Sequence, residues 1–253
     1  MKACKGILMV LFFSCVMIAC GGGGSSESEE TTSALSSQEQ AEIVAATLST
    51  DQGGVGQDIE SLARPADRQA QAAANLSLTV SAEMNFYDAE NQLQAGYNPE
   101  TTDRIEYESV IQGQFTTNSC YFQEYVIDNR SAFLATDLLS GTAVIDGTHS
   151  NHSSYVRSSS VNNTEVHYNL ACDLAAVGVV IDLDANDTFP EAGMIEGTVS
   201  GSYERITSLS HVTKELYFHF TATYMGDNTA EIELSDGTIF SVHLGSGAVA
   251  ELD

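Results

Sequence analysis

The stretch Leu76–Phe86, LSLTVSAEMNF, decides the fold class of this chain. Apolar and polar residues alternate through all eleven positions, so every second side chain is apolar. An α-helix has a period of 3.6 residues and cannot place such a set on one face, whereas a β-strand has a period of two. The stretch therefore predicts a strand with one buried face. Burial of its six apolar side chains would contribute on the order of 10 kcal/mol before the loss of chain entropy is subtracted.

The same alternation recurs along the rest of the chain, first in Ile105–Phe115. Asn162-Asn163, Gly226-Asp227-Asn228 and Ser235-Asp236-Gly237 lie between later runs, and these residue types tolerate the positive φ of tight hairpins. Consecutive strands joined by short turns predict an all-β fold: a curled antiparallel sheet, open barrel or sandwich of ten or eleven strands. The further predicted strands are Tyr121–Ile127, Leu139–Thr148, Ser154–Val161, Glu165–Cys172, Val177–Leu183, Met194–Ile206, Glu215–Tyr224, Ala230–Leu234 and Thr238–Leu244.

Short helices are predicted before the first strand. Ser36 and Glu39 have the spacing of a capping box, and a helix over Ser37–Ser49 would place Ala41, Val44, Ala45 and Leu48 on one face. A second short helix is predicted over Gln57–Arg64, before Pro65. Both segments are too weakly amphipathic to fold alone, so we expect them to dock on the β domain or to fray.

The composition excludes several classes of protein. The chain has 35 acidic and 9 basic residues, a net charge of −26, and 43% of its residues are hydrophobic. That hydrophobic content is too high for a disordered chain. Nucleic-acid binding requires basic side chains that neutralise phosphates, so this acidic chain is not expected to bind nucleic acid.

The N-terminus has the features of an export signal. Lys2 and Lys5 precede a 14-residue apolar stretch, Gly6–Ala19, which is short for a membrane-spanning helix. It ends at Met17-Ile18-Ala19-Cys20, which resembles the lipobox of bacterial lipoproteins. The resemblance implies that Cys20 is lipidated and becomes the new N-terminus. In lipoproteins of bacteria with two membranes, an Asp directly after the cysteine signals retention in the inner membrane. Here that residue is Gly21, so the resemblance favours the outer membrane in such a host.

These features divide the chain into four segments. Residues 1–19 form the signal peptide, 20–34 the lipidated cysteine and a flexible acidic Gly/Ser tether, 35–75 a helical segment and 76–253 the β domain. Removal of the signal peptide takes away Lys2 and Lys5, so the net charge becomes −28. The alternative to a lipoprotein signal peptide is an ordinary cleaved signal peptide or an uncleaved anchor helix.

Two cysteines, Cys120 and Cys172, lie in the predicted β domain. An even number of cysteines in an exported protein predicts a disulfide between them. Closing a loop of about 52 residues would stabilise the fold by roughly 4 kcal/mol on the chain-entropy model.

Acidic residues of one turn form a candidate calcium site. Asp182, Asp184 and Asn186 have the D-x-D-x-N spacing that opens a calcium loop, and Asp187 is adjacent. Asp187 stands where such a loop has Gly, and Gly193 stands where it has Glu, so we expect weak affinity at most. A solvated acidic turn that binds no ion is the competing interpretation.

Histidines give a second metal hypothesis. His149 and His152 are three residues apart, and Glu165 and His167 belong to a neighbouring predicted strand. The competing interpretation is that His149 and His152 are surface residues of a Ser-rich turn. His211, His219 and His243 are expected to point outward from strands.

No motif of a catalytic or cofactor site is present. The sequence lacks a G-x-S-x-G elbow, a phosphate loop, a dinucleotide fingerprint, H-E-x-x-H and C-x-x-C. We therefore expect no enzyme activity and no cofactor apart from weakly bound calcium. The sequence favours a lipid-anchored protein of the cell envelope that binds or scaffolds an envelope protein. The alternatives are a carrier of a lipid or other hydrophobic ligand in a β cavity, and a hydrolase that uses paired carboxylates.

Overall fold

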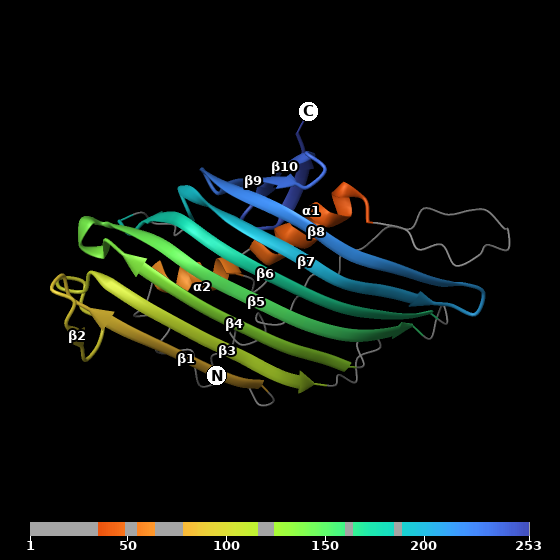
Figure 1. Ribbon diagram of the computed structural model, residues 1–253, viewed down its shortest axis with the longest axis horizontal. Helices are drawn as coiled ribbons and strands as arrows, with labels where there is room; N and C mark the ends of the chain where they lie inside the picture. The colour runs from red at the N-terminus through yellow and green to blue at the C-terminus, as the bar shows by residue number, and fades with distance from the viewer. Residues whose placement is uncertain are drawn as a thin grey trace, which may run out of the picture.

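The computed structural model describes residues 35–48, 55–63, 78–115, 124–159, 164–184 and 189–252. Two helices, α1 (Ser37–Leu48) and α2 (Val55–Ala63), precede eleven strands that form one antiparallel sheet (Figure 1). The all-β fold predicted from the alternation is therefore confirmed. No helix within the described ranges is long and apolar enough to cross a membrane.

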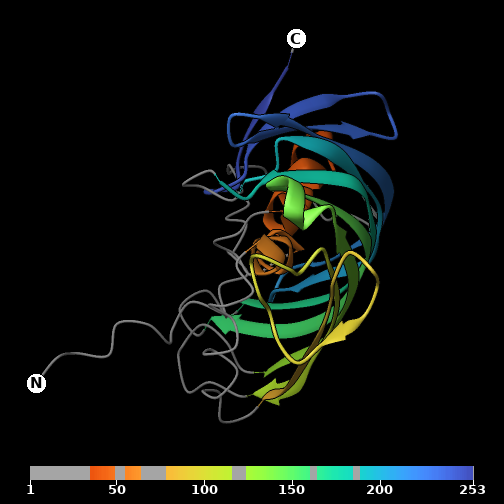
Figure 2. The same cartoon turned by 90° about the vertical axis from the view of Figure 1, so that its left-hand side faces the viewer.

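The strands follow one another across the sheet with a single exception. From β3 to β11 each strand pairs with the next, whereas β2 pairs with the end of β1 on the edge opposite to β3. The sheet curls but does not close, so it has an outer face and an inner face (Figure 2). The bounds are β1 (Leu78–Tyr87), β2 (Leu93–Gln94), β3 (Arg104–Phe115), β4 (Glu124–Thr136), β5 (Thr142–Ser159), β6 (Thr164–Asp182), β7 (Ala192–Ile206), β8 (His211–Gly226), β9 (Thr229–Leu234), β10 (Ile239–His243) and β11 (Ala248–Glu251), with a 3-10 turn η1 (Leu138–Ser140) before β5.

The central strands are longer than the sequence predicted. β5 has 18 residues and β6 has 19, which at the usual rise per residue makes β6 roughly 60 Å long. The sequence predicted two strands within each of these ranges. The predicted break in β6, residues 173–176, was wrong because these residues pair regularly with β7; the irregularity is a β-bulge further on, between Val177 and Val180, where Gly178 has a φ of 56°. The predicted break in β5 was wrong because its polar residues continue the strand across the inner face.

The apolar face of β1 is only partly buried. Phe86 is buried and Met84 packs against the core, but Ala82 on the same face is exposed. Among the side chains that the structure describes, the predicted buried face is therefore confirmed at the C-terminal end of β1.

Two of the three predicted hairpins lie among the described residues. Between β8 and β9, Gly226, Asp227 and Asn228 all have positive φ, which suits Gly, Asp and Asn. Between β9 and β10, Gly237 has a φ of 84° and its N–H donates to Leu234 O. The turn at Asn162-Asn163 lies outside the described residues.

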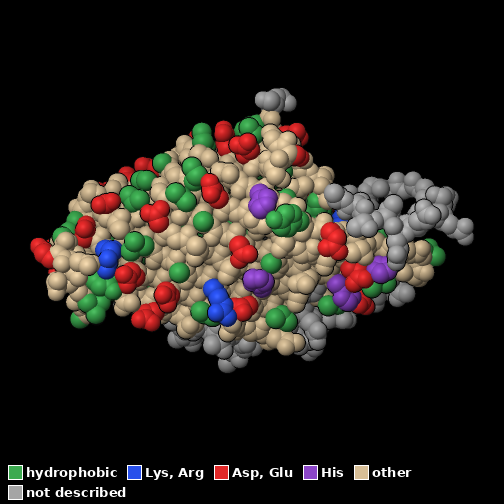
Figure 3. All heavy atoms as spheres, viewed as in Figure 1, with side chains coloured by type: hydrophobic (Ala, Val, Ile, Leu, Met, Phe, Trp, Pro, Cys, Tyr) green, Lys and Arg blue, Asp and Glu red, His purple; other side chains and the backbone are tan. Residues whose placement is uncertain are grey.

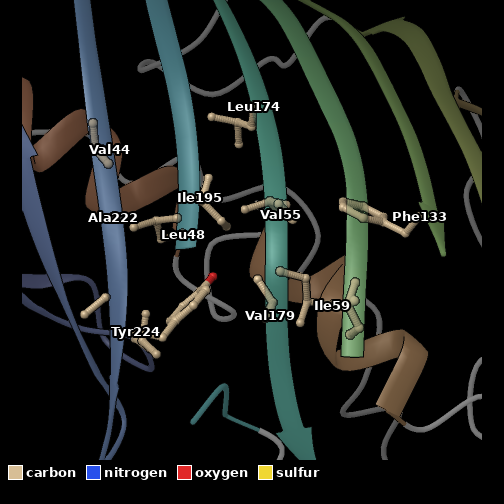
Figure 4. Packing of buried hydrophobic residues seen from close by; sticks show 14 of the residues in the cluster. Val44, Leu48, Val55, Ile59, Phe133, Leu174, Val179, Ile195, Ala222 and Tyr224 are labelled. Atoms are coloured by element: carbon tan, nitrogen blue, oxygen red, sulfur yellow. The ribbon is translucent and has the colours of Figure 1, made fainter. Parts of the chain in front are cut away.

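Helix α1 covers the inner face near β9, β10 and β11. The predicted apolar stripe of Ala41, Val44, Ala45 and Leu48 is fully buried, so the expected docking is confirmed (Figure 4). The predicted capping box is also present: Ser36 N–H donates to Glu39 Oε2 at 2.8 Å, and Glu39 N–H donates to Ser36 Oγ at 3.3 Å. The helix is described to Leu48, and the predicted last residue, Ser49, lies outside the described residues.

Polar contacts fix α1 to the sheet at its N-terminal end. Lys214 Nζ of β8 lies 3.2 Å from Glu39 Oε1, and Ser37 Oγ donates to Asp236 Oδ2 in the β9–β10 turn at 2.7 Å. Burial alone would raise the pKa of Glu39, but the hydrogen bonds from Ser36 N–H and Lys214 outweigh it and hold that pKa below its usual value.

Helix α2 lies on the inner face against β5. Val55, Ile59 and Leu62 are buried, and Figure 4 shows Val55 and Ile59 beside Val179 and Phe133. The two helices and the inner face of the sheet therefore share one hydrophobic core.

The Glu39–Lys214 contact predicts a pH-dependent contribution to stability. Because the folded state lowers the pKa of Glu39, the contribution is complete above the unfolded value of about 4.5 and is lost as the pH falls through the folded-state value. Glu39→Gln keeps a side chain suited to the capping box, and we expect it to lower the free energy of unfolding by about 0.5 to 1 kcal/mol at pH 7. Urea unfolding at several pH values measures this difference.

The control is Glu42→Gln on the same helix, where the carboxylate accepts a hydrogen bond from Gln38. A Glu39→Gln penalty that is the same at pH 3 and pH 7, or no larger than the control at pH 7, would contradict this role for Glu39.

Candidate functional site

Four polar side chains meet on the inner face of the sheet, and we call them the inner polar cluster: Asp58, Tyr107, Ser131 and His149. Asp58 comes from α2, and the others come from the neighbouring strands β3, β4 and β5. Ser131 lies directly opposite His149 in the strand register. His149 is only 3% exposed. Helix α2 therefore places a carboxylate over three adjacent strands.

Hydrogen bonds connect all four residues. Tyr107 OH donates to Asp58 Oδ1 at 2.9 Å, and Ser131 Oγ donates to Asp58 Oδ2 at 2.6 Å. Ser131 Oγ is also 2.8 Å from His149 Nδ1, which lies 3.4 Å from Asp58 Oδ2. An ionised Asp58 has no proton to give, so the single proton of Ser131 is directed to Asp58. His149 Nδ1 must then carry the proton that it donates to Ser131 Oγ.

More polar residues lie on the same face beside this cluster. Because side chains alternate with a period of two, Ser109, Asn129, Asn151 and Ser153 face inward like Ser131 and His149, and all four are buried. We call them the flanking polar residues. Four buried side-chain atoms of the described residues have no hydrogen-bond partner: Asn129 Oδ1 and His149 Nε2 on this face, and Arg104 Nε and Asn228 Oδ1 elsewhere. Buried polar atoms without a partner are uncommon in folded proteins.

The arrangement differs from that of a catalytic triad. In a triad the serine contacts one imidazole nitrogen and the aspartate contacts the other. Here Ser131 and Asp58 both lie at His149 Nδ1, while Nε2 has neither as a neighbour. Ser131 Oγ donates to Asp58, and the residue is buried. The geometry therefore orients the His149 ring and does not activate Ser131 as a nucleophile.

The predicted metal pair of His149 and His152 is wrong. The alternation of β5 places His149 on the inner face and leaves His152 exposed on the outer face, so the two imidazoles cannot reach one ion. The expectation that His149 is a surface residue is wrong as well. In the part of the chain that the structure describes, no group of three or more His, Cys, Asp or Glu side chains could hold a metal ion.

The other histidines lie on the outer face as expected. His211, His219 and His243 are exposed. His167 Nε2 is 2.5 Å from Glu165 Oε1, and His211 Nε2 is 2.5 Å from Glu204 Oε1. Figure 3 shows the outer face, where acidic side chains are scattered among polar surface and few basic ones are visible.

The structure describes only part of the candidate calcium turn. Asp184 N–H donates to Asp182 Oδ1 at 2.8 Å, a local turn contact. Asn186 and Asp187 lie outside the described residues. Calcium binding at this turn therefore stays a prediction.

The predicted disulfide is not seen. Cys172 of β6 is a free cysteine that is buried on the inner face, where its thiol contacts the Thr47 hydroxyl of α1. Cys120 lies outside the described residues. Burial raises the pKa of the Cys172 thiol to about 12, so this thiol is protonated and unreactive at neutral pH.

Sequence reasoning missed Asp58, Tyr107 and Ser131. A signal for the inner face was present in β5, because His149, Asn151 and Ser153 are polar residues at a strand period of two. Asn129 and Ser131 repeat that spacing on β4. Asp58 had no local signal, since its partners are 49 and 73 residues away along the chain.

Comparison of this chain with protein-family models, with curated proteins and with solved structures finds no match. The inner polar cluster and the features of the sequence are therefore what supports a function for this protein.

The buried Cys172 predicts slow alkylation of the folded protein. At pH 8 a pKa of about 12 leaves roughly a thousandfold less thiolate than the ordinary value of 9. We expect iodoacetamide to leave Cys172 unmodified in the native protein and to modify it in concentrated urea, as read from the mass of the peptide that contains it. Fast native labelling, or a peptide disulfide-linked to Cys120, would contradict the buried free thiol.

Proposed function

We propose that the protein is a lipid-anchored, non-catalytic binding protein of the bacterial cell envelope, and that its ligand contacts the inner polar cluster. The observation that supports this most is that two buried atoms without hydrogen-bond partners, Asn129 Oδ1 and His149 Nε2, lie together on this face. Leaving such an atom unsatisfied costs about 1 to 3 kcal/mol, and a bound ligand that hydrogen-bonds to it would offset this cost.

The anchor part of the proposal comes from the sequence. The positive N-terminus, the apolar stretch and Cys20 occur in the order typical of bacterial lipoproteins. The acidic Gly/Ser tether that follows would allow the β domain to reach a partner away from the membrane surface. The outer membrane is the favoured location because Gly21 follows the cysteine.

The inner face favours a polar ligand over the hydrophobic ligand of the carrier hypothesis. Side chains of α1 and α2, including Leu48 and Ile59, already pack against the apolar part of that face. The neighbouring part on β4 and β5 presents Asn129, His149 and Asn151. A lipid tail would have to cover these polar groups without hydrogen-bonding to them, which is unfavourable.

The inner polar cluster gives no support to a hydrolase that uses paired carboxylates, because Asp58 is the one carboxylate among the buried side chains of the described residues. Both of its oxygens accept hydrogen bonds, from Tyr107 and from Ser131. Calcium binding at Asp182 and Asp184 stays a separate proposal.

Replacement of Cys20 tests the anchor. Cys20→Ser removes the thiol that the acyl chains would modify, so we expect complete loss of incorporation of a fatty-acid analogue during growth, measured by gel fluorescence of the tagged protein. The matched control is Cys15→Ser, which removes the nearby cysteine of the apolar stretch and should label like the unchanged chain. Equal labelling of both variants would contradict lipidation at Cys20.

Native mass spectrometry tests the binding function. The protein is extracted from its host membrane in lauryldimethylamine oxide, a detergent without a hydroxyl group, and measured before and after denaturation and refolding. We expect a non-covalent mass in the first sample that is absent from the second. Identical masses in both samples, with no binding of added envelope extract, would contradict the proposal.

A further inference from the structure

The ligand class can be inferred from the hydrogen-bonding character of the atoms without partners. Resting on the binding function proposed above, we propose that the inner polar cluster and its flanking residues bind a ligand through hydroxyl groups, as a sugar or polyol presents them.

The first step concerns His149. The chain of hydrogen bonds through Ser131 to Asp58 places the proton of an uncharged His149 ring on Nδ1. Nε2 of that ring is then a bare acceptor, and it is buried without a partner. A group that donates a hydrogen bond is needed to satisfy it.

The second step concerns Asn129. Its Oδ1 is also an acceptor without a partner. Asn129 is two residues from Ser131 on β4, and Ser131 is directly opposite His149, so the two open acceptors occupy diagonal positions on adjacent strands. Such positions are about 7 Å apart, within the span of two hydroxyl groups of one sugar ring and its substituents.

The third step excludes anionic groups. The buried polar residues in the described part of the chain include no Lys or Arg. Lys214, which faces α1, is paired with Glu39. A phosphate or carboxylate on the inner polar cluster would therefore lie beside Asp58 without a basic residue among the buried polar side chains, which is unfavourable.

The fourth step separates hydroxyl from ammonium groups. Both carboxylate oxygens of Asp58 already accept hydrogen bonds, from Tyr107 and from Ser131. The two atoms of this face that lack partners, Asn129 Oδ1 and His149 Nε2, carry no negative charge, and an ammonium group requires an anionic partner when it is buried. Ser109, Asn151 and Ser153 both donate and accept, as hydroxyl groups do.

The experiment is a titration followed by NMR of the histidine side chains. The ¹⁵N-labelled protein in lauryldimethylamine oxide micelles is titrated separately with glucose, N-acetylglucosamine, myo-inositol, ethylamine and inorganic phosphate, each to 50 mM. We expect at least one hydroxyl compound to shift His149 Nε2 saturably, with no shift at His152 on the outer face of the same strand. Asn129→Leu should weaken that binding about three- to tenfold, the effect of one neutral hydrogen bond.

A measurement on the unchanged protein tests the inference without any variant. The ¹⁵N shifts of neutral His149 should show the proton on Nδ1, and a proton on Nε2 would overturn the inference, because Nε2 would then be a donor. Shifts caused by ethylamine or phosphate and by none of the hydroxyl compounds would also overturn it, while leaving the binding function intact. No shift with any compound overturns the inference, and together with an unchanged native mass it would contradict the binding function as well.

Discussion

The structure depends on the hydrogen bonds of Asp58 to the strands beneath it. A single curled sheet cannot bury its inner face against a second sheet, so other elements must cover it. Helices α1 and α2 do this with a mostly apolar surface, and Asp58 is the buried carboxylate that α2 brings into the core. Its bonds to Tyr107 and Ser131 satisfy that carboxylate and fix α2 over β3 and β4. The same bonds orient His149, so the packing of the helix and the chemistry of the inner face have one cause.

The sequence predicted those parts of the fold that depend on neighbouring residues. Alternation identified the strands, the Ser36–Glu39 spacing identified the start of α1, and the Gly226–Asn228 turn identified a hairpin. It failed where a polar residue is buried by a distant segment. His149, Asn151 and Ser153 resembled a Ser-rich turn because nothing nearby indicated that α2 would cover β5. The continuity of β5, and with it the site, depends on contacts between residues far apart along the chain.

The candidate site combines residue types that are familiar from catalysis in an arrangement suited to binding. Ser131 lies between Asp58 and His149 Nδ1, so it holds the ring in place and leaves Nε2 as an acceptor. The polar residues that flank it are neutral and belong to adjacent strands, which makes the surface rigid. Uncharged, partly unsatisfied side chains beside one carboxylate, Asp58, are what supports the proposed recognition of an uncharged polar ligand. The proposed tether would carry this face away from the membrane to which the proposed lipidation of Cys20 would attach the protein.

The central claim is that Asp58 connects α2 to the sheet through Ser131, and a double-mutant cycle tests it most directly. The free energies of unfolding of the unchanged chain, Asp58→Ala, Ser131→Ala and the double variant are compared by urea denaturation. The contact at 2.6 Å predicts a coupling energy of about 1 to 3 kcal/mol, because each single change removes the same buried hydrogen bond. Additive effects, with a coupling energy within about 0.3 kcal/mol of zero, would contradict the placement of α2 over β4.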